Sequence, residues 1–562
     1  MNIKDLYAVA NDLFGKKSPL QSLWQEIAEN FYPERAEFTL RRSIGADFAA
    51  NLMTSYPAMC RRDLGNQFGT MLRPTAKPWF HIQRQFIEKN EDIDVKRALD
   101  QFEKTQRRAM YDPVSMFTRA TKEGDHDFAA FGQCAISVEI NNDPVYGQHL
   151  LYRCWHLRDM CWQENEAGKI GYVFRKWKPT ANTMVRTFKN VHQKVHDIAL
   201  KTPFVELECM HMIVDAAMYD GDAKGKKRWS IWYDYQNDHI MEAVPINHKH
   251  YIIPRWQTVS NSQYSYSPAT VAALPDARLI QAMTFTLLEA GEKATSPPMI
   301  ATMDAVRSDI AVFAGGITWV DNEYDERLGD ALRPINQDFR GFNFGVQMAT
   351  DARALIREAF YLNALQMPQR STEMTAYEVG QRVQEYIRNA LPIFEPLEAE
   401  YNSALCEESF DLLVRYGAFG PPGSWPEKLQ GSNIEFTFES PLHDAIDQQK
   451  GQKILEVKTL LADAIAVDPS SAYIVDAKIA LRDALMGIQT PPTWLRSEDE
   501  IKILAAKQAQ QQAAQTMLGS MEQASNVAKN LQGTAVQGAS NAGAGPGVSG
   551  MPQPMPQPGM GA

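Results

Sequence analysis

Apolar residues recur at helical spacing over the first part of the chain, and then at strand spacing. Leu6, Val9 and Leu13 predict one helix within residues 4–32, and Ser18-Pro19 predicts the start of a second, which Pro33 ends. Further helical patterns cover 46–71, 90–111 and 114–131, and alternating patterns that predict strands cover 79–83, 134–140, 149–158 and 170–177. These patterns predict a mixed α+β block.

Residues 180–199 have the pattern of one helix with Thr180 as its N-cap. The hydrophobic period then changes to two, with strands predicted at 205–213 and 229–234 and a turn between them that contains Asp220-Gly-Asp222. The pattern therefore predicts a small β-rich module inserted between two helices. Two helices that flank an insertion can lie antiparallel as its stalk.

The second of these flanking helices lies between Ser267-Pro268, which predicts its start, and Pro297-Pro298, which predicts its end. We expect Pro275 to restart this helix, because proline cannot donate a hydrogen bond into a preceding turn. The 20 residues from Pro275 to Ala294 would span roughly 30 Å. No charge lies between Leu279 and Leu288, which suits either a buried core helix or a helix packed beside copies of itself in a ring.

After Pro298 the chain is rich in glycine up to Gly345, and helices are predicted over 349–364, which carries Arg353 and Arg357, and over 376–416. A strand at 434–439 and helices over 441–487 and 497–531 follow. From residue 533 the composition is Gly, Ala, Ser, Met, Pro and Gln, which cannot bury enough apolar surface to offset the entropy of ordering. We expect this tail to be disordered.

Composition narrows the class of protein. The 562 residues carry 57 Lys and Arg against 68 Asp and Glu, a net charge of −11, which argues against a protein that coats nucleic acid by bulk attraction. This charge is compatible with a channel whose negatively charged surface repels DNA phosphates, so that DNA passes through it without binding tightly. The six scattered cysteines predict free thiols in a reducing compartment, and we expect neither a signal peptide nor a membrane span.

No motif predicts catalysis, a metal site or a cofactor. His192 and His196 have the spacing of a metal pair, but the glutamate of a metalloprotease is missing, so a solvated helix face is favoured. Gly15-Lys-Lys-Ser18 lacks the upstream glycine and the preceding strand of a phosphate loop, so no ATP hydrolysis is expected. Cys154, His156 and Cys161 are too loosely placed for zinc.

Two basic segments allow either of two interpretations. The turn that contains Lys224, Lys226, Lys227 and Arg228 could touch DNA or a partner, or it could be a solvated turn. Arg353 and Arg357 could likewise face phosphates or lie on an ordinary helix surface. Contacts of lone arginines with phosphates would position DNA without reading its sequence.

Several short segments of the sequence resemble, in their order and spacing, those of the head-to-tail connector (portal) proteins of short-tailed bacteriophages. The resemblance covers roughly residues 20–450. The segments are Leu64-Gly-Asn-Gln-Phe-Gly-Thr-Met-Leu-Arg-Pro74 before Pro78-Trp-Phe80, His250-Tyr-Ile-Ile-Pro-Arg-Trp256, the segment from Tyr264 to Met299, Ile356-Arg-Glu-Ala-Phe-Tyr361, and Met374-Thr-Ala-Tyr-Glu-Val379 followed by Arg382.

The resemblance implies a predominantly helical α+β subunit that assembles into a twelve-subunit ring at one capsid vertex. Such a ring conducts double-stranded DNA inward during packaging and outward during ejection. The implied partners are further copies of the chain, DNA, major capsid and scaffolding proteins, terminase and then a tail adaptor protein. The implied location is the virion, after synthesis in the bacterial cytoplasm, and no cofactor is implied.

The resemblance also implies a division of the chain. The expected parts are a wing (1–179 and 297–435, with a candidate tunnel loop at 321–345), stem helices at 180–199 and 266–296, a clip (200–265), a crown (436–496), a barrel-type helix (497–531) and a disordered tail (532–562). An internal ejection protein and a hydrolase without a recognisable motif are the alternatives.

Three sets of residues follow as candidates. Facing the DNA channel we expect Arg278, Lys293, Arg353 and Arg357. Contacting a partner from the clip we expect Lys224, Lys226, Lys227 and Arg228. Packing between subunits at the stem we expect Leu279, Gln281, Met283, Thr284, Thr286 and Leu287.

Overall fold

The structure is a computed structural model. It describes residues 1–43, 45–49, 52–75, 77–85, 93–260, 262–295, 297, 299–301, 332–334, 340–363, 395, 397–421, 423, 425–438, 457, 460–461 and 507. The chain divides into two units, Met1–Gly487 and Ile488–Ala562, and every helix and strand described below belongs to the first.

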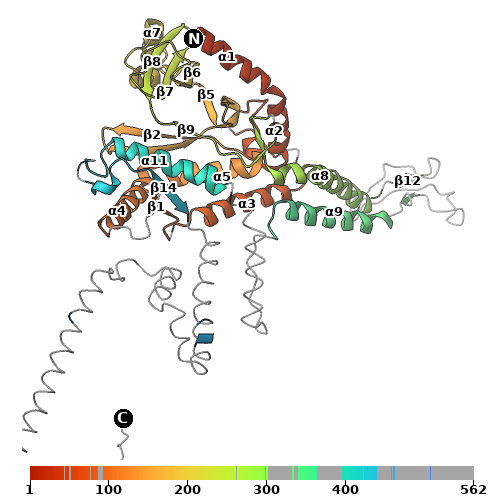
Figure 1. The fold of residues 1–562 in the computed structure, drawn as a ribbon. Helices are drawn as coiled ribbons and strands as arrows, with labels where there is room; N and C mark the ends of the chain where they lie inside the picture. The colour runs from red at the N-terminus through yellow and green to blue at the C-terminus, as the bar shows by residue number, and fades with distance from the viewer. Residues whose placement is uncertain are drawn as a thin grey trace, which may run out of the picture. The chain divides into compact units, whose positions relative to one another are not determined.

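The predicted α+β architecture is confirmed in the described residues (Figure 1). The helices are α1 (Ile3–Lys16), α2 (Ser18–Phe31), α3 (Tyr56–Leu72), α4 (Ile93–Met110), α5 (Phe117–Phe131), α6 (Ala181–Thr187), α7 (Gln193–Lys201), α8 (Pro268–Thr295), α9 (Arg340–Ala359) and α11 (Ser403–Arg415), which follows a π-helical turn at Glu398–Asn402. The strands are β1 (Phe80–Arg84), β2 (Ile136–Asp143), β3 (Gly147–Cys154), β4 (Met160–Glu164), β5 (Ile170–Trp177), β6 (Cys209–Asp215), β7 (Arg228–Asp234), β8 (His239–Ile246), β9 (Tyr251–Ile252), β10 (Gln257–Thr258), β11 (Ser265–Tyr266), β12 (Met299–Ala301), β13 (Leu332–Pro334) and β14 (Ile434–Phe438).

A five-stranded antiparallel sheet has the order β4-β5-β6-β7-β8. The expectation that 200–265 forms a separate β module is wrong, because β6 pairs with β5 from before residue 180, with Val173 opposite Ile213. One face of the sheet is covered by α1, whose Leu6 and Leu13 are buried together with Met212 and Ile231. The strands predicted within 204–256 are therefore present, but they continue a sheet that starts earlier in the chain.

The single helix predicted over 180–199 is also wrong. Thr180 caps α6 as expected, its Oγ1 accepting a hydrogen bond from the Thr183 N–H, but α6 ends at Thr187 and α7 starts only at Gln193. Phe188 adopts an extended conformation and is buried with Met184 and Cys209. Cys209 and Met210 point to opposite faces of β6, so α6 and α7 cover the sheet face that α1 leaves open.

A larger core unites the remaining elements, in which α3 packs on α5, and β2 pairs with β3 and β9. Within it, the buried Arg73 and Asp125 form an ion pair, and the Arg73 Nη1 also donates to the Asn402 Oδ1 at 2.7 Å. The first and last described strands also pair: β1 lies antiparallel to β14, with Phe80 opposite Phe438. This pairing joins the N-terminal block to the segment after α11.

The start of α8 is fixed to the end of α5. Gly132 ends α5 at φ +72°, where a Cβ would lie 2.1 Å from the Tyr266 carbonyl carbon, so only glycine fits. The Ser267 hydroxyl donates to the Ala129 carbonyl at 2.8 Å, and the Thr270 hydroxyl donates to the Ala130 carbonyl at 2.8 Å. These contacts set the direction in which α8 leaves the core.

The restart of the helix expected at Pro275 is wrong, because α8 runs unbroken from Pro268 to Thr295. Proline removes only the hydrogen bond that the Val271 carbonyl would accept. Val271 lies on the exposed side of the helix, where solvent can replace the missing donor.

Several other predictions lie largely outside the described residues. They are the crown beyond residue 438, the barrel-type helix, the tail, and the first half of the helix over 376–416, whose second half contains α11. Of the candidate tunnel loop, the described parts are not loop: 332–334 is strand β13 and 340–345 is the first part of α9.

Candidate functional site

The candidate site is the α8–α9 hairpin, and it combines a helix, a β segment and a second helix. α8 and α9 lie side by side (Figure 1), and strands β12 and β13, which follow α8 and precede α9, pair antiparallel with Met299 opposite Pro334. The sequence predicted this arrangement with 180–199 as the partner of α8. The structure gives that position to α9, because α6 and α7 pack on the five-stranded sheet.

The two helices of the hairpin pack closely through Gly345. A Cβ at this position would lie 3.0 Å from the Leu287 Cδ2 and 3.4 Å from the Met283 Cε. The end of α9 is held by the core, where Ile356 and Phe360 are buried and the Phe360 ring lies 5.4 Å from that of Phe31. Met283 and Leu287, predicted to pack between subunits, therefore pack within the chain.

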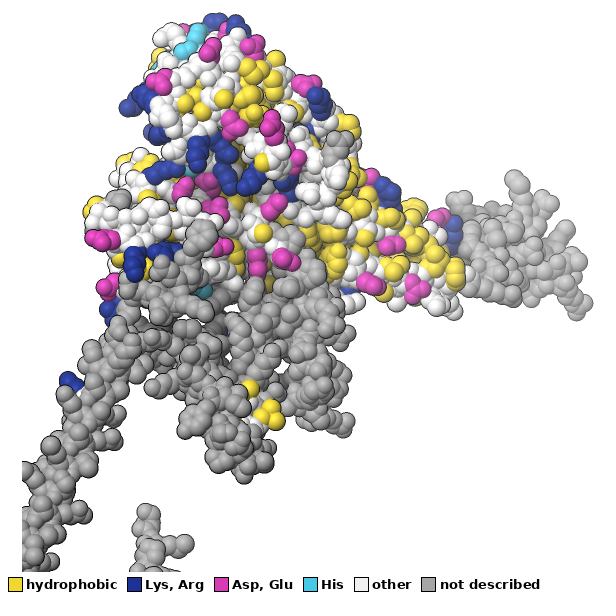
Figure 2. All heavy atoms as spheres, viewed as in Figure 1, with side chains coloured by type: hydrophobic (Ala, Val, Ile, Leu, Met, Phe, Trp, Pro, Cys, Tyr) yellow, Lys and Arg dark blue, Asp and Glu magenta, His cyan; other side chains and the backbone are white. Residues whose placement is uncertain are grey.

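Other apolar side chains of the hairpin face solvent. Phe285 is 54% exposed, Leu288 is 55% exposed and Phe344 is 65% exposed. Leu279, Phe342, Val346 and Leu355 are exposed as well. Figure 2 shows hydrophobic side chains gathered along this arm of the molecule. A contiguous exposed apolar surface on a single chain typically marks an interaction site.

The uncharged polar residues of α8 are satisfied within the chain. The Gln281 Oε1 accepts hydrogen bonds from the N–H groups of Met53 (2.8 Å) and Thr54 (3.0 Å), and its Nε2 donates to the Thr54 carbonyl at 3.0 Å. The hydroxyls of Thr284 and Thr286 donate to carbonyls one turn earlier in α8, at 2.7 and 3.0 Å. None of these groups requires a polar partner from a neighbour, so the outer face of α8 can pack by shape alone.

Gln281→Leu is expected to release the segment around Met53 and Thr54 from α8. Three backbone groups lose their partner, and each unsatisfied group costs about 1–3 kcal/mol where it stays buried. The free energy of unfolding should fall, and amide hydrogen exchange of residues 52–55 should accelerate. Thr286→Val is the matched control, because its hydroxyl bonds only within α8; equal exchange in both variants would contradict the clamp.

Three of the four channel candidates have a partner within the chain. Arg278 is bonded to Glu26 of α2, its Nε lying 2.7 Å from the Glu26 Oε1, and the Lys293 Nζ lies 2.7 Å from the Glu289 Oε1 on the same helix. The Arg357 Nε donates to the Asn363 Oδ1 at 2.8 Å. Arg353 is exposed on α9 and has no hydrogen bond or ion pair to any described residue. It is thus the freest of the four.

The basic turn between β6 and β7 is mostly solvated. Lys224, Lys226 and Lys227 are exposed, and Lys224 adopts φ +50° while its N–H donates to the Asp222 Oδ1 at 2.9 Å. Arg228 belongs to β7 and lies opposite Asp215, with 3.5 Å between the Arg228 Nε and the Asp215 Oδ1. Three of the four residues are free to contact a partner.

We found no arrangement of catalytic side chains among the described residues. They contain no group of three His, Cys, Asp or Glu side chains that could hold a metal. All six cysteines are free, and burial raises the pKa of the Cys60 thiol, near Arg357, to about 11, so it stays protonated. No helix among the described residues is long and apolar enough to cross a membrane.

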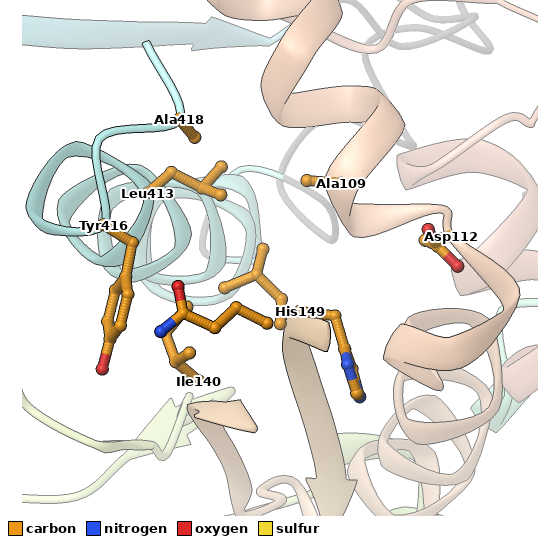
Figure 3. Close-up of a pocket in the computed structure, with 9 residues that line it drawn as sticks. Ala109, Asp112, Ile140, His149, Leu413, Tyr416 and Ala418 are labelled. Atoms are coloured by element: carbon orange, nitrogen blue, oxygen red, sulfur yellow. The ribbon is translucent and has the colours of Figure 1, made fainter. Parts of the chain in front are cut away.

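One cavity, of about 240 Å³, lies between α4, the β2–β3 hairpin and α11 (Figure 3). Ala109 and Leu413 face it from the two helices, with Tyr416 at one side and Asp112 at the other. The Asp112 carboxylate accepts from the Val114 N–H at 3.0 Å. The other titratable residue of the lining, His149, contacts the Gly147 carbonyl and the Asn141 side chain through its ring nitrogens, and not Asp112.

The prediction from the sequence missed the first part of α9 and its role as the partner of α8. The buried residues Ala349, Ala352 and Ile356 of α9, and Phe360 directly after it, repeat at helical spacing. Phe342 and Val346 extend an apolar pattern before them, and that signal could have started the helix at 340 instead of 349. The loop expected there, on the glycines Gly341 and Gly345, concealed it.

Comparisons with known proteins found one matching family and two similar proteins. Residues 4–495 match the sequence profile of a family described as "Bacteriophage head to tail connecting protein". The chain is 23% identical over 528 residues to a "Probable portal protein" of Bordetella phage BPP-1, a match that covers 91% of this chain and 92% of the relative. It is 20% identical over 560 residues to a "Portal protein" of Salmonella phage epsilon15, covering 96% and 97%.

Proposed function

The chain belongs to the family of bacteriophage head to tail connecting proteins, and we propose that copies of it close into a ring around a DNA channel. Its function is that of a phage portal, a structural component of the virion at the capsid vertex. The other interpretations of the sequence, an internal ejection protein or a hydrolase, are not favoured by these relatives.

The observation that carries the ring proposal is the exposed apolar surface of the α8–α9 hairpin. The described residues of the chain leave Phe285, Leu288 and Phe344 more than half exposed, and a neighbouring copy would supply the surface that covers them. In a cyclic ring each copy contacts the next through two different surfaces, and the last contact closes on the first copy. On this basis α8 and α9 form the stem, in place of α8 and residues 180–199.

The rest of the functional assignment follows from that stem. The insert between α8 and α9 takes the place that we expected for 200–265 and faces terminase during packaging and then the tail adaptor protein. Twelve copies, as in the family that the sequence resembles, surround double-stranded DNA, and the opposite end of the stem meets capsid and scaffolding proteins. A net charge of −11 keeps DNA from sticking to the ring.

Imaging of the purified full-length chain by negative-stain electron microscopy tests this proposal, together with native mass spectrometry to count the copies. We expect rotationally symmetric rings with an open centre and one dominant copy number. A chain that stays monomeric at micromolar concentration, or that forms only irregular aggregates, would remove the basis for the ring.

Arg353→Glu is expected to weaken DNA passage while the ring survives, because Arg353 is exposed and bonded to no described residue. Each lost phosphate contact lowers the dependence of DNA binding on salt by about one unit of slope. The measurements are DNA packaged per particle and DNA binding by rings at several salt concentrations. Lys194→Glu on α7, an exposed cation off the hairpin, is the control; equal packaging in both variants would exclude Arg353 from the channel.

A further inference from the structure

A second cavity lies where α1 ends and α2 begins. It measures about 460 Å³. Gly15 and Ser18 line it from the α1–α2 junction, and it is lined on its other sides by Arg41, Arg158, Asp159 and Lys176. The cavity therefore has three cationic side chains and a single carboxylate on its walls.

The carboxylate is already used by one of the cations. Arg158 holds Asp159 through two hydrogen bonds of 3.1 Å, from its Nε and its Nη2, and its Nη1 lies 3.5 Å from the Glu37 Oε2. Arg41 and Lys176 have no acid partner among the described residues. The Lys176 Nζ lies 4.2 Å from the centre of the Phe14 ring. Glu208 lies within electrostatic range of Arg41 but is already paired with Lys178, so neither of these two cations of the cavity has an ion-pair partner of its own.

A third uncompensated charge lies in the junction itself, between Gly15 and Ser18. Lys17 is only 1% exposed, and its Nζ donates to the carbonyls of Leu157 (2.9 Å), Arg158 (3.1 Å) and Met160, with no carboxylate in contact. Burial lowers the pKa of Lys17 to about 8, so the ammonium is still mostly charged at neutral pH. Carbonyl dipoles satisfy its hydrogen bonds but do not cancel its charge.

We propose that this cavity binds a phosphate monoester, with Arg41 and Lys176 as the charged contacts and the Ser18 hydroxyl as a neutral donor. A dianion matches two free cations, and guanidinium and ammonium groups bind phosphate oxygens by charge-assisted hydrogen bonds. α2 has no side-chain cap, so the positive end of the helix adds to the same field. The proposal is independent of ring formation.

The size of the cavity is compatible with several sources of the phosphate. A volume of about 460 Å³ holds a free phosphate, a mononucleotide or the terminal 5′-phosphate of DNA. The surroundings lack the loop of an ATPase, because Gly15-Lys-Lys-Ser18 joins two helices and no strand precedes it.

Isothermal titration calorimetry of the full-length protein tests the proposal, with three probes titrated separately: inorganic phosphate, adenosine monophosphate, and a short DNA duplex with or without a 5′-phosphate. We expect Arg41→Ala and Lys176→Ala each to weaken binding about tenfold, the usual effect of losing one charge-assisted hydrogen bond. Lys194→Ala, which removes an exposed cation elsewhere, should change nothing. Melting temperatures show whether each variant is folded.

The pattern of results decides both the site and the source. Preference for the phosphorylated duplex, lost in both cavity variants, assigns the site to DNA ends; binding of phosphate or mononucleotide alone assigns it to a free ligand. No binding of any probe by the wild-type chain overturns the proposal. Binding that all three variants retain, or lose equally, also overturns it, because the contact would then be adventitious.

Discussion

Replacement of both Phe285 and Leu288 by glutamate is expected to leave the chain folded and monomeric. Both side chains are more than half exposed in the single chain, so their loss removes little of its own core. In a ring they would be enclosed by the neighbouring copy. A charge buried there without a partner costs about 3–5 kcal/mol, which weakens each interface more than a hundredfold. Closure requires every interface, so the ring should disappear.

Light scattering after size-exclusion chromatography, with native mass spectrometry, measures this effect. The matched control places two glutamates at Val145 and Tyr146, which are 79% and 66% exposed at the tip of the β2–β3 hairpin. This control has the same change in charge and apolar surface at a different place. Rings that persist in the α8 variant, or that both variants lose equally, would show that the hairpin is not the interface.

The sequence was sufficient to locate α8 but not its partner. Ser267-Pro268 and Pro297-Pro298 mark its two ends in any fold, because they act through local backbone geometry. The partner depends on distant contacts. Residues 180–199 and 340–359 both have helical patterns, and the first is drawn to the sheet because Phe188 packs against Trp232, with ring centres 5.3 Å apart. No periodicity contains that information.

The same limit applies to the division of the chain. The resemblance implied boundaries at residues 180 and 200, yet β5 and β6 pair across both of them. Local patterns predict strands well, but strand order within a sheet is set by packing on both faces. Here α1 and the α6–α7 pair bury opposite faces of one sheet, which fixes β4 to β8 as a unit.

At the level of single residues, composition could not separate inward from outward positions on α8. Met283 and Leu287 pack on Gly345 of α9, whereas Phe285 and Leu288 face solvent, although all four are apolar. By residue type Gln281 suited a subunit interface and Arg278 suited a DNA channel, but each has a partner within the chain, at Thr54 and Glu26. The apolar pattern of the sequence predicts which side chains share a face of α8, but only the three-dimensional structure shows which residues contact that face.

Acid is expected to destabilise the junction between the five-stranded sheet and β9. His211 of β6 is buried there with its ring stacked on Trp232 at 4.0 Å, and its centre lies 4.9 Å from that of His250. The rings of His250 and His248 lie 6.0 Å apart. The charged groups nearby are Arg175, Arg228, Arg415, Lys226, Glu139 and Glu408. Three histidines thus share this region with four cations and two carboxylates.

The sign of the effect follows from the direction of the pKa shifts. Burial, with the neighbouring cations adding to it, lowers the pKa of His248 to about 4, that of His250 to about 3 and that of His211 well below its usual value. Below pH 6.5 the unfolded chain therefore takes up protons that the folded chain refuses. The stability that these histidines contribute is full above pH 6.5 and falls as pH decreases toward 4, by at most about 4 kcal/mol per pH unit for the three together. Burial raises the pKa values of Glu139 and Glu408, which acts in the opposite direction and reduces the net slope.

Urea unfolding at several pH values between 7 and 4.5 measures this slope, and His250→Asn tests its origin. His250 adopts φ +64°, a left-handed conformation that asparagine tolerates, so the backbone is preserved while one titrating ring is removed. The loss of stability per pH unit should become smaller by about 1.4 kcal/mol, the share of one histidine, while His126 and His156, whose pKa values burial also lowers, keep contributing. His149→Asn, on β3 outside the cluster, should leave the slope unchanged. If this cluster causes the acid sensitivity, removing one of its buried neutral histidines must reduce the slope. Identical slopes in His250→Asn and wild type would therefore place the acid sensitivity elsewhere.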